Sequence, residues 1–247
     1  MSRALLAALL LGMAGSAVAS EGHALPYKFE PDAKPASLQR GARNYMNYCS
    51  GCHSMRNLRY SRVARDLEIP EGLLKTNLMF TSDKVGDPIH ASMPAESAKW
   101  FGQQPPDLTV ETRKRGADWV YNYLMTFYLD DTRPTGVNNL VLPGASMPHV
   151  LWELQGWQVK PAKHEAEGAA EGEGHGKHGA GLELAQPGKL SAEDYKKFVA
   201  DTVNFMAYAA EPGRSHRISI GIGVILFMLV LTVLAYLLKR EYWSDVH

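Results

Sequence analysis

Cysteine is scarce in this sequence of 247 residues. Its only two cysteines, Cys49 and Cys52, lie three positions apart. A structural zinc site needs four ligands, often from two such pairs, and the chain has no second pair. The small number of cysteines therefore argues against a structural zinc site. Both thiols lie instead in one short segment, where they could act together.

The sequence also lacks net charge. Its 26 lysines and arginines balance 26 aspartates and glutamates, so the formal net charge at pH 7 is zero. Nucleic-acid-binding domains usually carry a clear excess of positive charge. We therefore expect no nucleic-acid partner.

The first 19 residues, MSRALLAALLLGMAGSAVA, have the layout of a secretory signal peptide. One positive charge at Arg3 precedes an apolar run, and the small residues Ala17 and Ala19 form a cleavage site. The apolar run is shorter than the roughly 20 residues that a membrane span needs. We predict cleavage after Ala19 and export of residues 20–217 as one domain.

Residues 218–238, ISIGIGVILFMLVLTVLAYLL, contain no charged side chain. At ~1.5 Å per residue this run spans roughly 30 Å, the thickness of the hydrocarbon core of a bilayer. Lys239 and Arg240 follow it directly, as is typical of a cytoplasmic helix end. We predict a single-pass protein of the inner (cytoplasmic) membrane, with residues 20–217 in the periplasm and residues 239–247 in the cytoplasm.

The two cysteines belong to the pattern Cys49-Ser50-Gly51-Cys52-His53. A redox-active dithiol would need a βαβ context, which the flanking sequence does not supply. Covalent attachment of a haem uses all three functional residues, because two thiols bond to the vinyl groups and the histidine ligates the iron. In an exported chain we interpret this pattern as the attachment site of one haem c.

The iron of such a haem needs a second axial ligand. Met93 and Met147 both occur in the tripeptide Ser-Met-Pro, and a proline can fix the backbone of a ligand loop. A further proline and a glycine precede Met147 in the stretch LPGASMPHV, which favours this methionine. Met93, His149 and His90 remain alternatives on these grounds.

Two stretches have apolar residues at helical spacing. One precedes the cysteine pattern and would present its last turn to the porphyrin: Leu38, Ala42, Tyr45, Met46 and Cys49. The other begins at a helix-start signal, Ser191 with Asp194, and ends before Pro212: Tyr195, Phe198, Val199, Thr202, Val203 and Met206.

Several separated blocks, in this order, resemble the cytochrome c1 family, the haem-bearing subunits of ubiquinol–cytochrome c oxidoreductase (bc1) complexes. The blocks are 45-YMNYCSGCHSM-55, 105-PPDL-108, 113-RKRGADWV-120, 134-PTG-136, 142-LPGASMP-148, 209-AAEP-212 and 239-KREYWS-244. The resemblance implies a mostly α, class-I-like c-type cytochrome domain with long irregular loops, plus one C-terminal transmembrane helix.

The resemblance also implies roles for individual residues. Cys49 and Cys52 would form the thioether bonds, and His53 and Met147 would be the axial ligands. Arg115 would lie near a haem propionate, where a permanent cation offsets the carboxylate charge. Three further residues would line the haem pocket: Tyr45, Pro106 and Trp119.

In this family the chain would accept one electron from the Rieske iron–sulfur protein and pass it to a c-type cytochrome, with cytochrome b as the membrane partner beside the lipid. It would have no independent active site. A free-standing, membrane-anchored cytochrome c is the alternative function. A c-haem peroxidase would usually carry a second attachment motif, whereas this sequence contains only the motif at Cys49–His53.

The sequence departs from the family pattern at residues 160–189, which are rich in glycine, alanine, glutamate and histidine. Such a segment cannot bury enough apolar surface to offset the entropy lost on ordering. We predict a flexible surface insertion. Binding of a metal by His164, His175 and His178 is a weaker hypothesis than a solvated tract.

Overall fold

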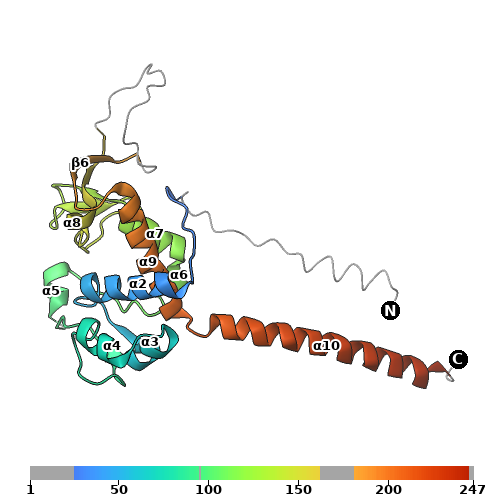
Figure 1. The fold of residues 1–247 in the computed structure, drawn as a ribbon. Coiled ribbons are helices and arrows are strands. Elements are labelled where there is room, and N and C mark those ends of the chain that lie inside the picture. Colours follow the sequence, from blue (N-terminus) through green and yellow to red (C-terminus); the bar gives the residue numbers. More distant parts are fainter. Residues whose placement is uncertain (1–24, 95, 162–180, 245–247) are drawn as a thin grey trace, which may run out of the picture.

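Helices predominate in the computed structural model, which describes residues 25–94, 96–161 and 181–244 (Figure 1). The helices are α2 (Pro35–Tyr48), α3 (Tyr60–Asp66), α4 (Glu71–Asn77), α5 (Ser97–Phe101), α6 (Glu111–Arg115), α7 (Ala117–Met125), α8 (Trp152–Gln155), α9 (Ala192–Ala210) and α10 (Arg214–Tyr242). The expected mostly α fold is confirmed. The predicted signal peptide lies outside the described residues.

In the described residues, the strands form three short antiparallel pairs. The pairs are β1 (Met55–Arg59) with β2 (Pro88–Ile89), β3 (Phe127–Leu129) with β4 (Val137–Asn139), and β5 (Gly156–Val159) with β6 (Glu183–Pro187). Such pairs are too small to form a core of their own. Strand β3 also contacts β5, so two of the pairs lie next to each other.

Helix α2 begins with Pro35 in its first turn, where a missing N–H breaks no helical bond. Four members of the predicted stripe are buried along its inner face: Leu38, Ala42, Tyr45 and Met46. The helix predicted before the cysteine pattern is therefore confirmed, and it ends at Tyr48, directly before Cys49.

Helices α2 and α9 pack against each other and cross beside Gly41 (Figure 1). A Cβ atom at Gly41 would lie 2.0 Å from the backbone oxygen of Asp201, so only glycine fits without displacement. Polar side chains surround this crossing. The Asp201 carboxylate accepts hydrogen bonds from Ser37 Oγ at 2.6 Å and from Arg40 Nη2 at 2.9 Å.

Helix α9 starts where the sequence predicts. The Ser191 hydroxyl oxygen accepts a hydrogen bond from the Asp194 backbone N–H at 3.1 Å and so caps the helix. The predicted apolar stripe faces the protein interior, with Phe198 only partly buried. Asp201, Asn204 and Phe205 are also buried, because α9 has neighbours on more than one side.

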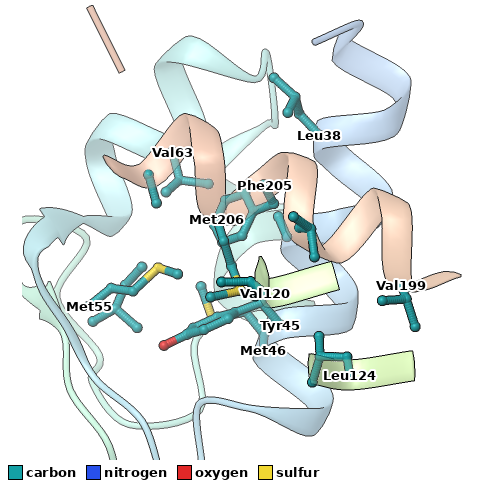
Figure 2. Close-up of a cluster of buried hydrophobic side chains, with 14 of the residues drawn as sticks. Leu38, Tyr45, Met46, Met55, Val63, Val120, Leu124, Val199, Phe205 and Met206 are labelled. Atoms are coloured by element: carbon teal, nitrogen blue, oxygen red, sulfur yellow. The ribbon is translucent and has the colours of Figure 1, made fainter. Parts of the chain in front are cut away.

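The core lies where α2, α7 and α9 meet the segment of β1 and α3 (Figure 2). Tyr45 and Phe205 occupy its centre, with ring centroids 5.8 Å apart, and both side chains are completely buried. Met55 and Met206 fill the space around them. This core places the end of α2 firmly against α9.

The C-terminal part of the predicted flexible insertion, residues 160–189, is ordered in the structure. Residues 183–187 form β6, which pairs with β5 from Gly156↔Pro187 to Val159↔Glu183. Leu182, directly before the strand, is buried, so apolar burial and strand pairing together order this part of the segment. Residues 162–180, which include the three histidines, lie outside the described residues.

Helix α10 extends away from the rest of the protein (Figure 1). Within the described part of the chain it is the one helix whose length and composition would allow it to cross a membrane, with a mean hydropathy of 2.8 over its apolar window. Three residues, 211–213, connect it to α9, and Arg217 forms an ion pair with Glu211 across this connection.

Candidate functional site

A cavity of about 320 Å³ lies between the end of α2, helices α6, α7 and α9, and the loops around residues 101–108 and 142–151. Its lining is largely apolar and includes seven of the eight predicted site residues, five of which are Cys49, Cys52, His53, Pro106 and Arg115. Met147 and Trp119 line it as well.

The cysteine pattern forms a tight turn at the end of α2. The backbone N–H groups of Cys52 and His53 donate to the Cys49 carbonyl at 3.1 and 2.9 Å. This turn brings two free thiols and one imidazole to the same cavity. Burial, with a smaller contribution from Cys52, raises the pKa of Cys49 to about 12.

The imidazole of His53 is fixed by a backbone group. Its Nδ1 atom lies 2.8 Å from the Pro106 carbonyl oxygen. A carbonyl can only accept, so Nδ1 carries the proton and Nε2 keeps a free lone pair. Burial lowers the pKa of His53, although the bond to Pro106 opposes that shift. The neutral imidazole is the form that ligates a metal.

The structure separates the four candidates for the second axial ligand. Met147 lines the cavity. Met93 is half-buried and His90 is exposed, and both lie outside the lining. His149 is buried beside the cavity wall, stacked on Phe127 with ring centroids 5.1 Å apart. Of these four side chains, the geometry favours Met147.

Arg115 and Trp119 form one contact at the junction of α6 and α7. The guanidinium carbon of Arg115 lies 4.3 Å from the centroid of the Trp119 ring, and its Nε atom pairs with Glu111. Trp119 in turn stacks on Tyr123 at 5.2 Å. The arginine thus places a positive charge on the cavity wall, where Glu111 and Lys114 also lie.

Tyr45 has a different place from the one expected of a pocket residue. It is completely buried in the core and is not among the residues that line the cavity. Its hydroxyl donates to the His53 carbonyl oxygen at 2.8 Å, and burial raises the pKa of its phenol. Tyr45 therefore supports the turn from behind.

Several lining residues were not predicted as site residues. They come from α9, from the last residue of α5 and from the loop after it: Phe198, Thr202, Met206, Phe101, Gln103 and Gln104. The sequence assigned Phe198 and Met206 to an apolar helix face, and that face serves both the core and the cavity wall. The loop residues follow no periodic pattern that would have identified them.

The donor set fits a c-type haem. Two thiols and an imidazole lie on one turn, a thioether reaches the same cavity from a loop, and the remaining wall is mostly apolar. Within residues 25–94, 96–161 and 181–244, no cluster of three or more histidine, cysteine, aspartate or glutamate side chains could hold a metal ion.

Comparison with known proteins shows which family the chain resembles along most of its length. The model of the Cytochrome C1 family matches residues 31–160 and 189–246, on either side of the glycine- and histidine-rich segment. A cytochrome c1 of Allochromatium vinosum is 51% identical over 215 residues, which cover 86% of this chain and 85% of the relative.

Two further relatives and one solved structure are similar to the chain. The ammonia monooxygenase gamma subunit of Nitrosomonas europaea is 43% identical and covers 87% of this chain and 86% of its own length. A cytochrome c1 of Rhodospirillum rubrum is 28% identical, with 99% and 97% covered. A chain of a hyperthermophilic respiratory Complex III aligns over the full length of both chains with 15% identity and a TM-score of 0.45.

Proposed function

Because this chain belongs to the cytochrome c1 family, we propose that it binds one covalent haem c and transfers single electrons within a respiratory bc1 complex. One observation carries the proposal: Cys49, Cys52, His53 and Met147 all line a single cavity. When bound, the haem supplies reversible one-electron chemistry by cycling between Fe(III) and Fe(II).

The chain's own residues would hold the haem and set its properties. Cys49 and Cys52 would attach the vinyl groups, and His53 would ligate through Nε2. Because the Nδ1–H of His53 is already bonded to Pro106, the ring orientation is set before any ligand binds. Met147 would contribute a soft sulfur ligand, which favours Fe(II) and raises the potential.

The cavity wall would control charge and water. Its largely apolar lining would exclude solvent from the macrocycle. Arg115 would offset the charge of a propionate, and Lys114 on the same wall adds a second cation. Glu111 pairs with Arg115, so α6 would place one carboxylate and two cations, Arg115 and Lys114, near the propionate.

The proposed partners follow from the family. The electron donor would be the Rieske iron–sulfur protein, the acceptor a c-type cytochrome, and the membrane partner cytochrome b. Helix α10 would anchor the chain in the inner membrane, with the cavity on the periplasmic side. The complex, and not this chain alone, would carry out quinol oxidation.

Extraction in mild detergent tests this function. Purification through a tag on this chain should recover cytochrome b haems and a Rieske centre in fixed proportion to the covalent haem. A denaturing gel stained for haem should show colour at the mass of this chain. Recovery of the chain with its haem but without the other centres would instead indicate a free-standing anchored cytochrome.

A further inference from the structure

We infer that Asn139 is a positioning residue, which holds the loop that carries Met147 against the cavity. The inference rests on the proposed function, because it concerns the loop of the proposed axial ligand. Asn139 is the last residue of β4, and residues 140–148 follow it directly. Its side chain is completely buried.

The amide oxygen of Asn139 holds the start of the loop. It accepts hydrogen bonds from the backbone N–H groups of Val141 at 2.9 Å and Leu142 at 3.1 Å. Both bonds are partly buried, so the loss of the acceptor would have a cost that water offsets only in part. These two bonds therefore fix how the chain leaves the strand, and Leu142 is itself part of the cavity wall.

The amide nitrogen of Asn139 holds a different part of the same wall. It donates to the Tyr123 carbonyl oxygen at 2.7 Å. Tyr123 lies in the last turn of α7, where backbone carbonyls lack helical partners, and it lines the cavity. One side chain thus ties the ligand loop to the helix that forms the neighbouring wall.

A second pair of contacts fixes the loop nearer to Met147. The N–H of Gly144 donates to Asn138 Oδ1 at 2.8 Å, and its carbonyl accepts from Arg133 Nη2 at 2.9 Å. Gly144 has φ +79°, a conformation that glycine adopts readily. Side chains of the β3–β4 hairpin therefore hold both backbone groups of a residue that lies just before the ligand.

The chemistry explains why asparagine suits position 139. The site needs an acceptor for two N–H groups and a donor for one carbonyl at the same time, which a carboxamide supplies. An aspartate would keep the acceptor but lose the donor to Tyr123 and bury a charge. A thioether bond to iron is weak enough that the loop must keep the sulfur in place.

Carbon monoxide binding to the reduced, haem-loaded complex tests the inference. In Asn139→Ala the loop should leave the iron more often, so carbon monoxide should bind at least about tenfold faster than to the wild type. Haem content should stay at the wild-type level, because attachment uses Cys49, Cys52 and His53. Met147→Leu marks the rate of a fully open site.

Asn122→Ala is the matched control. Asn122 is also completely buried, and its amide bonds the backbone of Tyr27, with N–H···Oδ1 at 2.8 Å and Nδ2–H···O at 2.7 Å. It should therefore lose comparable stability, yet it bonds no residue of the loop 140–148. Its carbon monoxide rate should stay near that of the wild type.

Arg133→Ala provides a milder variant, because it removes only the bond to the Gly144 carbonyl. It should raise the rate less than Asn139→Ala does. Amide hydrogen exchange of the peptide 140–148 should be faster in both variants and unchanged in Asn122→Ala. If Asn139→Ala does not load haem, Arg133→Ala and its exchange pattern decide the question.

The outcomes separate this inference from the proposed function. Suppose that Met147→Leu opens the site as expected. The positioning role would then be overturned if haem-loaded Asn139→Ala bound carbon monoxide at the wild-type rate. It would also be overturned if Arg133→Ala showed the wild-type rate together with unchanged hydrogen exchange. A rate in Asn122→Ala as high as in Asn139→Ala would show general loosening and would also overturn it. If Met147→Leu itself stays closed, the ligand assignment fails first.

Discussion

The Nδ1 atom of His53 and the carbonyl oxygen of Pro106 lie 2.8 Å apart, although 53 residues separate them in the sequence. The contact joins the cysteine turn to the loop that follows α5. The ring of Pro106 fixes its φ, which limits the conformations of this part of the loop. The folded chain therefore orients the His53 ring through this contact, with Nε2 left available to ligate a metal.

Met147→Leu tests the second axial ligand. Leucine roughly keeps the volume but removes the sulfur, so the haem should stay attached while the reduced protein binds carbon monoxide. Without the soft ligand Fe(II) is less favoured, and the midpoint potential should fall by a few hundred millivolts. Each ~59 mV changes a one-electron equilibrium tenfold. Redox titration would show the drop, and the complex should assemble without turnover.

Met93→Leu is the control for that experiment. Met93 also occurs in Ser-Met-Pro but lies outside the cavity lining. Its substitution should leave the spectrum and the potential nearly unchanged. The opposite pattern in the two variants would assign the ligand to Met93.

Removal of residues 162–180, with a short glycine–serine link, should leave the haem and the visible spectrum unchanged. The segment is flanked by β5 and β6, whose ends pair at Val159 and Glu183, so a short link can close the hairpin. Haem staining and absorbance spectroscopy would check this. Loss of haem would show that the segment is needed for the fold of the cavity.

Gly41→Ala should destabilise the protein by about 1–3 kcal/mol, because the added methyl group would overlap the backbone of α9 beside Asp201. Gly72→Ala is the control. Nothing lies within 4 Å of a Cβ atom at Gly72, in helix α4, so that change should be neutral or stabilise by up to about 1 kcal/mol. Thermal unfolding of the detergent-solubilised protein would compare the two, and equal effects would contradict the close crossing.

Asp66 should make stability depend on pH. Burial raises its pKa, but hydrogen bonds from Arg62, Tyr208 and Arg65 outweigh burial and leave the pKa below its ordinary value. Because its pKa is lower in the folded state, the Asp66 carboxylate stabilises the folded protein at pH values above its unfolded pKa of about 3.9. This stabilisation is lost as the pH falls through the folded pKa.

Asp66→Asn should therefore lower the unfolding temperature at pH 7. The loss in free energy of unfolding should be less than about 1 kcal/mol, because the ion pairs of Asp66 are partly exposed. The difference from the wild type should shrink as the pH falls below about 4. A difference that grows on acidification would mean that the carboxylate is not stabilising.

Protease added to intact spheroplasts should remove the haem domain and leave the C-terminal tail protected. This follows from the predicted export of residues 20–217 and from the basic residues after the apolar run. Immunodetection of tags at the two ends would report the result. Survival of the haem domain would reverse the proposed topology.

The sequence predicts the helices better than the loops. The stripe on α2 and the Ser191 cap of α9 follow from local periodicity and hydrogen bonding, and both are confirmed. Strand β6 was missed because it is exposed along its length and has no alternation of apolar and polar residues. Its order comes from pairing with β5, a tertiary contact that a local pattern does not record.

The candidate site divides in the same way. Cys49, Cys52 and His53 follow from a fixed spacing within five residues, so the sequence alone places them together. The choice between Met93 and Met147 depends on which loop reaches the cavity, and residue type settles this only in part. Asn139 carries no sequence signal, because its role consists of bonds to three backbone groups that only the fold brings within reach.

The three-residue connection between α9 and α10 has a mechanical consequence. Arg217 and Glu211 brace it, and α9 is packed along the wall of the cavity. With α10 in a bilayer, so short a connection would keep residues 25–210 close to the lipid surface.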